Sequence, residues 1–142
     1  MVGSVRVWSL RELKDVIIPE GTERIGNHWF YGCDIKSAEI PASVKCIDAS
    51  AFYECKNLKR VVLAEESRLE KIGNRCFASS GIEEITLPCT VREIGGYAFF
   101  ACDSLKTIYV EDGCEASFVH TCVPGPTRII SLSTTLIGGM GI

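Results

Sequence analysis

The sequence lacks the features that mark membrane-spanning, nucleic-acid-binding and zinc-finger proteins. No apolar run approaches the roughly 18 residues of a membrane helix, and residues 1–10 lack the basic start and apolar core of a signal peptide. The 15 Lys and Arg against 18 Asp and Glu give a net charge of -3, without a basic stripe. No Cys-x-x-Cys pair occurs among the eight cysteines. These absences predict a soluble chain with no membrane insertion and no nucleic-acid partner.

A catalytic constellation is also missing. Glu83 and Glu84 are adjacent in a predicted strand, so they face opposite sides and are poorly placed for joint acid-base chemistry. Cys114 and His120 resemble a nucleophile and base only out of context, because no third group that would orient the pair is identifiable. The sequence therefore does not predict an enzyme.

What the sequence does contain is one unit repeated along the chain, most complete in residues 51–63. A phenylalanine ladder recurs with steps of 22, 25 and 22 residues, and an isoleucine ladder five residues earlier keeps the same steps. The members are Phe30, Phe52, Phe77 and Phe99, and Ile25, Ile47, Ile72 and Ile94. Independent ladders with one shared period predict a solenoid whose stacked repeats bury a continuous core.

Each repeat predicts a short strand, a second apolar segment and an aromatic turn. The strands follow from alternating apolar pairs at Val16/Ile18, Ala38/Ile40, Val61/Leu63, Ile85/Leu87 and Ile108/Val110. Pro19, Pro41 and Pro88 should end their strands, because proline cannot donate to a sheet ladder. Gly26, Gly73 and Gly95 are expected to adopt unusual backbone angles in tight turns. The longer step should produce a bulge at residues 65–67.

The domain organisation follows from where the repeat is regular. We predict a single solenoid over residues 1–142, with regular repeats at 13–110. Residues 1–12 form a partial turn, with Trp8 in an aromatic core position and Val5 and Val7 in a short strand. Residues 111–132 form a C-terminal cap, whose last strand at 128–132 places Ile130 and Leu132 in line with Ile108 and Val110. Residues 133–142 are expected to be a frayed tail.

Two segments carry a family resemblance. Residues 82–88, Ile-Glu-Glu-Ile-Thr-Leu-Pro, and residues 91–102, Val-Arg-Glu-Ile-Gly-Gly-Tyr-Ala-Phe-Phe-Ala-Cys, resemble the BspA-type leucine-rich repeat. The resemblance covers residues 13–110, with departures at Trp29, Ala64, Cys76, Ser80 and Glu111. It implies an α/β leucine-rich-repeat solenoid, a β-rich right-handed superhelix with a parallel sheet on one face and short helical or 3-10 turns. It also implies microbial or protist surface or secreted proteins that mediate adhesion and protein binding, without a catalytic motif.

The cysteines fall into three groups. Cys33, Cys55, Cys76 and Cys102 occupy core positions and should pack as small hydrophobic residues. Cys46 and Cys89 are expected to be exposed, as is His28. Cys114, His120 and Cys122, with Cys102, leave three alternatives open: a zinc site, a Cys114–Cys122 disulfide, or unpaired residues. The spacing favours unpaired residues, so no metal or other cofactor is predicted.

The readable binding surface is the outward face of the strands. Its candidate residues alternate with the buried positions: Asp15, Ile17, Ser37, Glu39, Arg60, Val62, Glu84, Thr86, Thr107 and Tyr109. Arg60 and Tyr109 are the residue types that anchor protein interfaces, although an ordinary solvated sheet face fits the same pattern.

Three functional hypotheses follow. The first is a noncatalytic protein-interaction or adhesion module that binds a host or matrix protein through this face. The second is a thiol or zinc-binding protein that uses the C-terminal cysteine and histidine cluster. The third is an excised or engineered repeat segment without activity of its own. Exposed solenoid ends also predict self-association.

Overall fold

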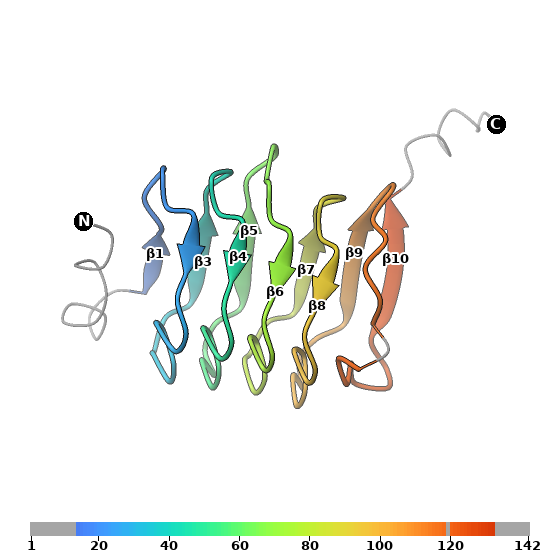
Figure 1. Cartoon of the computed structure of the whole chain (residues 1–142). Helices are drawn as coiled ribbons and strands as arrows, with labels where there is room; N and C mark the ends of the chain where they lie inside the picture. The colour runs from blue at the N-terminus through green and yellow to red at the C-terminus, as the bar shows by residue number, and fades with distance from the viewer. Residues whose placement is uncertain (1–13, 119, 133–142) are drawn as a thin grey trace.

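A computed structural model describes residues 14–118 and 120–132, which form two parallel sheets and no helix. Figure 1 shows the strands stacked along one axis, with β1 and β10 at opposite ends. The larger sheet has the order β1-β3-β5-β7-β9-β10 and the smaller sheet β2-β4-β6-β8. The larger sheet comprises β1 (Asp15–Ile17), β3 (Ser37–Ile40), β5 (Arg60–Leu63), β7 (Glu84–Leu87), β9 (Thr107–Glu111) and β10 (Arg128–Leu132). The smaller sheet comprises β2 (Arg24–Ile25), β4 (Cys46–Ile47), β6 (Lys71–Ile72) and β8 (Glu93–Ile94). The predicted parallel solenoid is confirmed.

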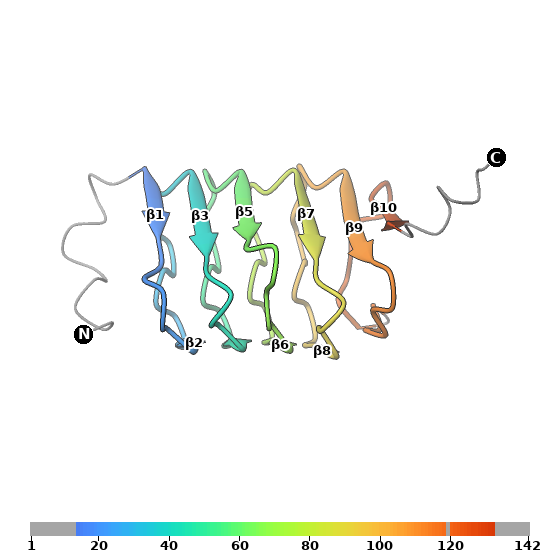
Figure 2. The ribbon, with the colours of Figure 1, turned by 90° about the horizontal axis from the view of Figure 1, so that it is seen from above.

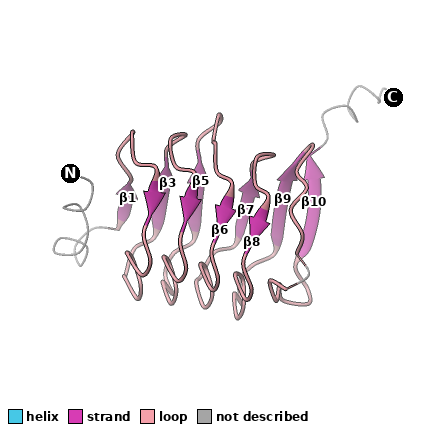
Figure 3. Ribbon diagram, viewed as in Figure 1, coloured by secondary structure: helices cyan, strands magenta, loops and turns pink. Residues whose placement is uncertain are grey.

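The third side of each coil consists of hydrogen-bonded turns, which we call the turn edge (residues 26–33, 48–55, 73–80 and 95–102). Along the turn edge, backbone hydrogen bonds within one coil alternate with backbone hydrogen bonds to the next coil. The Cys33 amide donates to the Phe30 carbonyl at 3.0 Å, whereas the Phe30 amide donates to Ala51 at 2.8 Å. The helical or 3-10 turns expected from the sequence are absent from the described residues, where these segments are loops and turns (Figure 3).

The phenylalanine ladder fills the interior behind the turn edge. Neighbouring rings stack nearly parallel, with centroid distances of 5.2 Å for Phe30 and Phe52, 5.4 Å for Phe52 and Phe77, and 5.8 Å for Phe77 and Phe99. All four rings are buried. Stacking of like side chains therefore supplies the apolar contacts that one short coil lacks.

The glycines after the isoleucine ladder are required for a different reason from the one predicted. Gly73 and Gly95 do not have positive φ; the left-handed residues come two positions later, at Arg75 and Tyr97. A Cβ atom on Gly73 would lie 2.5 Å from the Ala49 nitrogen, in the backbone of the preceding coil. Close packing between coils, rather than unusual backbone angles, therefore selects glycine here.

The predicted strand stops are confirmed at Pro41 and Pro88, whereas β1 already ends at Ile17, two residues before Pro19. Pro41 and Pro88 directly follow β3 and β7, and each proline carbonyl accepts a hydrogen bond from the amide three residues later. Ala64 accepts the equivalent bond from Ser67, so the turn survives this departure from the repeat pattern. The loop between β5 and β6 rises above its neighbours in Figure 1, as the extra residues at 65–67 predicted.

The last strand forms where the sequence predicted, but its register is shifted by one residue. Ile129, not Ile130, lies opposite Ile108. Because successive side chains in a strand alternate in direction, the shift places Ile130 on the outward face and Ile129 on the core side. All five residues of β10 are exposed, with Ile129 at 47%. The predictions for Trp8, Val5, Val7 and the tail at 133–142 lie outside the described residues.

Candidate functional site

The larger sheet brings the ten predicted binding residues onto one side of the solenoid in two rows, which we call the two-row face. The ladder register pairs neighbouring members within each row, except Val62 and Thr86, which are not a register pair. One row is Asp15, Ser37, Arg60, Glu84 and Thr107, and the other is Ile17, Glu39, Val62, Thr86 and Tyr109. Ser37, Thr107 and Tyr109 are half-buried and the rest are exposed, including Ile17 at 66% and Val62 at 40%. All ten side chains are therefore at least partly accessible to solvent.

Arg60 is the cation near the centre of this face. It lies opposite Glu84 in register, yet it forms no ion pair within residues 14–118 and 120–132. By contrast, the Ser37 hydroxyl donates to Asp15 Oδ1 at 2.7 Å, so one oxygen of that carboxylate already accepts a hydrogen bond. The guanidinium of Arg60 therefore keeps its hydrogen-bond donors available to a ligand.

A shallow hollow lies beside Arg60, between β5 and β7. Arg60 and Glu84 are the single register pair between these strands, whereas β7 and β9 share four pairs. Figure 2 shows β5 and β7 spread apart at this point. The hollow measures about 230 Å³ and is lined by residues 60–63 and 84–86. The longer coil that follows β5 therefore interrupts an otherwise regular sheet next to the unpaired arginine.

The turn edge carries an aromatic surface that the sequence reasoning missed. Tyr31 and Tyr53 lie 5.4 Å apart, and the guanidinium of Arg75 lies 5.1 Å from the centre of the Tyr97 ring. Tyr97 also meets Phe100 edge to face at 5.7 Å. The signal was present in the aromatic doublets at residues 30–31, 52–53 and 99–100, whose first members are buried and whose second members face outward.

Three of the four predicted core cysteines are buried, whereas Cys33 and Cys46 differ from the exposure expected of them. Cys55, Cys76 and Cys102 are buried, and burial raises the pKa of Cys55 to about 12. Cys33 is half-buried. Cys46, expected to be exposed, is also half-buried, and burial together with a 3.0 Å hydrogen bond to Asp48 raises its pKa to about 11.

The C-terminal cysteine and histidine residues do not converge. Cys102 is buried and donates to the Phe77 carbonyl at 2.9 Å, Cys114 is half-buried, and Cys122 is exposed. All three are free thiols, so the Cys114–Cys122 disulfide is not formed. No group of three His, Cys, Asp or Glu suited to a metal ion occurs among the described residues. The thiol or zinc alternative has no structural support in this arrangement.

No helix in residues 14–118 and 120–132 is long and apolar enough to cross a membrane. No curated protein matches the sequence. Among solved structures, the chain is similar to the pneumococcal vaccine antigen PcpA, at 21% identity and a TM-score of 0.68. That match covers 89% of this chain but 42% of the antigen, so the chain spans less than half its length.

Two further solved leucine-rich repeat proteins are similar. One, from Bacteroides capillosus, has 26% identity and a TM-score of 0.58, covering 72% of this chain and 80% of that one. Another, from T. pallidum, has 24% identity and a TM-score of 0.55, covering 84% and 70%. The model of the BspA type leucine-rich repeat region matches residues 6–118 in 6 copies. Because this match spans most of the sequence, the chain belongs to the BspA-type leucine-rich repeat family.

Proposed function

We propose that this chain is a noncatalytic protein-interaction or adhesion module that binds a protein partner through the two-row face. The observation that carries the proposal is the alignment of ten outward side chains from five strands into two rows. The rows surround a hollow beside an arginine that has no ion-pair partner in the described part of the chain.

The composition of the face fits a protein partner. Interface anchors are enriched in arginine and tyrosine, and they are surrounded by contacts that exclude water. Arg60 and Tyr109 supply the two anchor types, while Val62 at 40% exposure gives apolar area beside the hollow. The side chains stand on a hydrogen-bonded sheet, so their backbone does not have to become ordered on binding.

The family indicates the kind of partner. BspA-type repeats are commonly found in surface proteins that mediate adhesion or protein interaction, and they carry no catalytic motif. We therefore expect a cell-surface or secreted setting and a host or matrix protein as the partner.

The test compares two double variants that remove the same residue types from different faces. Arg60→Glu with Tyr109→Ser alters the two-row face. Arg75→Glu with Tyr97→Ser alters the turn edge, where Glu54 and Ser50 already adopt positive φ and show that these residue types are accommodated. Binding to a panel of purified extracellular-matrix proteins is measured by surface plasmon resonance. Circular dichroism confirms that both variants remain folded.

We expect the first variant to weaken binding about tenfold or more, because losing an anchor costs at least about 1.4 kcal/mol. The turn-edge control should bind as the wild type does. Equal weakening by both variants, or weakening by the control alone, would reject the two-row face. Absence of binding to every protein in the panel would reject a matrix partner.

Self-association through a solenoid end is a separate part of the proposal. The exposed apolar residues of β10, Ile129 at 47% and Leu132 at 41%, are the feature that supports it. Light scattering across a range of concentrations should show a mass above the monomer, and Ile129→Lys should remove that species. A monomer at every concentration would contradict this part of the proposal.

A further inference from the structure

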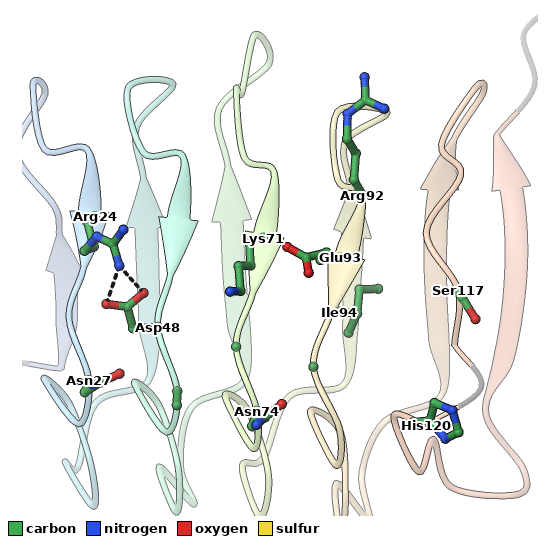
Figure 4. A pocket seen from close by; sticks show the side chains of 13 residues that line it. Arg24, Asn27, Asp48, Lys71, Asn74, Arg92, Glu93, Ile94, Ser117 and His120 are labelled. Atoms are coloured by element: carbon green, nitrogen blue, oxygen red, sulfur yellow. Dashed lines mark hydrogen bonds and ion pairs between the residues drawn. The ribbon is translucent and has the colours of Figure 1, made fainter.

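A polar groove crosses the smaller sheet, on a different side of the solenoid from the two-row face. It has a volume of about 580 Å³ and runs from Arg24 and Asp48 at one end to Ser117 and His120 at the other (Figure 4). Ligand pockets commonly measure roughly 300 to 1,000 Å³, so the space suits a small molecule.

The floor of the groove is backbone at Gly73 and Gly95, two positions where neighbouring coils pack closely. Gly73 and Gly95 line the groove without side chains. Their amides donate to the Ile47 and Ile72 carbonyls at 2.8 Å and 2.7 Å. Their carbonyls accept bonds from Cys76 and Ala98. The floor is thus a flat backbone surface whose hydrogen bonds are already made, and recognition falls to the side chains around it.

Two of these side chains are fixed in advance. The Arg24 guanidinium donates to both Asp48 oxygens, at 2.8 Å and 3.0 Å, and holds this carboxylate at one end of the floor. The Asn74 side-chain oxygen accepts a bond from the Gly96 amide at 2.8 Å. That bond sets the orientation of the amide group and leaves its NH₂ group free to donate. Preorganised groups reduce the cost of binding a ligand.

The charges around the floor balance. Arg24 and Asp48 neutralise each other as an ion pair. Lys71 and Glu93 lie opposite one another in register on β6 and β8, and neither has an ion-pair partner in the described residues. Arg92 stands at the rim with its guanidinium directed away from the floor (Figure 4). A ligand with a strong net charge gains little from such a site.

We propose that this groove binds a short neutral saccharide. Sugar hydroxyls both donate and accept hydrogen bonds, which matches a site that interleaves carboxylates at Asp48 and Glu93 with donors at Lys71 and Asn74. The glycine floor lets a ring lie flat against the backbone, and Ala49 and Ile94 add apolar atoms beside the polar side chains. The inference does not rest on protein binding by the two-row face.

The experiment is a titration of the isotope-labelled chain with saccharide probes, followed by two-dimensional amide NMR. The probes are maltose, cellobiose and N,N′-diacetylchitobiose, with diglycine as a zwitterionic comparator and sulfate as an anionic one. We expect at least one disaccharide to shift the amide signals of Gly73, Gly95 and Gly96, with a dissociation constant of about 1 mM, as suits an open polar site.

Matched charge deletions then test which residues hold the sugar. Lys71→Met with Glu93→Met removes the unpaired charges of the groove. Lys45→Met with Glu70→Met removes the same two charges from exposed neighbouring positions that do not line it. Each lost hydrogen bond to a charged group is worth about 1.5 to 3 kcal/mol, so the groove variant should bind at least about tenfold more weakly. The control should remain within about twofold of the wild type, since it loses no contact.

Several results would overturn the proposal. These are the absence of glycine shifts with every disaccharide, equal shifts in the groove variant, and shifts caused by diglycine or sulfate while the sugars are silent. The Arg60→Glu and Tyr109→Ser variant should bind the sugar normally. Failure of this inference and failure of the protein-binding proposal are therefore separate outcomes.

Discussion

Gly73 tests how tightly neighbouring coils are packed. Replacing it with alanine would add a Cβ atom 2.5 Å from the Ala49 nitrogen and 2.7 Å from the Asp48 carbonyl carbon. Both are backbone atoms of the preceding coil. They cannot retreat without straining the 2.8 Å hydrogen bond from the Gly73 amide to the Ile47 carbonyl. Gly96 is the matched control, because its Cβ would meet nothing closer than the His120 carbonyl oxygen at 3.8 Å.

We expect alanine to lower the free energy of unfolding at Gly73 and to leave it unchanged or raise it slightly at Gly96. Neither glycine has a positive φ, so alanine is conformationally acceptable at both positions. Alanine then reduces the entropy of the unfolded chain and stabilises by about 0.4 to 1 kcal/mol. At Gly73 this gain is outweighed by overpacking against rigid backbone, at the upper end of about 1 to 3 kcal/mol. Gly73→Ala should therefore lose about 2 kcal/mol, while Gly96→Ala should be unchanged or slightly more stable.

The assay is urea unfolding followed by far-UV circular dichroism, with midpoints and slopes compared among the wild type and the two variants. A lower midpoint for Gly73→Ala at an unchanged slope would match the expectation. Equal stability of the two alanine variants would refute the argument that close approach between coils selects glycine at this position.

Three further predictions concern the core and the thiols. Phe52→Ala removes a buried ring stacked on both sides and should cost about 3 to 5 kcal/mol in urea unfolding, whereas Phe100→Ala on the exposed turn edge should cost less than about 1 kcal/mol; similar losses would contradict the ladder. Iodoacetamide should modify the exposed Cys89 and Cys122 in the folded protein and reach Cys55, Cys76 and Cys102 only in denaturant, as read by intact mass; equal rates would show that the core opens. Burial raises the pKa of Cys55 to about 12, so the folded state keeps a proton that the unfolded thiol loses above about pH 9, and this stabilisation is complete below that pH and declines as the pH rises toward 12. The melting temperature of Cys55→Ala should therefore fall less steeply above pH 9 than that of the wild type, and equal slopes would exclude this thiol as the cause.

The fold could be predicted from the sequence because every repeat has the same need, which is to bury apolar side chains that one short coil leaves exposed. Each strand is too short to bury its apolar face, so the phenylalanine, isoleucine and strand ladders can be satisfied together only by stacking in register. The same logic placed the ten outward residues correctly, since side chains in a strand alternate between the two faces. The period gave no direct information about the turn edge, where loops and turns stand in place of the expected short helical segments.

Errors arose where the outcome depended on contacts between coils rather than on the period within one coil. The spacing of 22 residues predicted Ile130 opposite Ile108, but the last coil is one residue shorter and pairs Ile129 there instead. Gly73 and Gly95 were attributed to their own backbone angles, because the residues they meet in the preceding coil are 21 or more positions away in sequence. That contact is visible only once the coils are superposed.

The two-row face and the groove on the smaller sheet also differ in how far the sequence could predict them. The two-row face is made of side chains, so alternation along each strand was sufficient to find it. The groove on the smaller sheet has a backbone floor at Gly73 and Gly95, and its lining comes from five successive coils. The pattern of residue types within one repeat does not show which side chains from five repeats will line the same groove. In a solenoid, small-molecule sites must therefore be sought by comparing equivalent positions of successive repeats along one side of the coils.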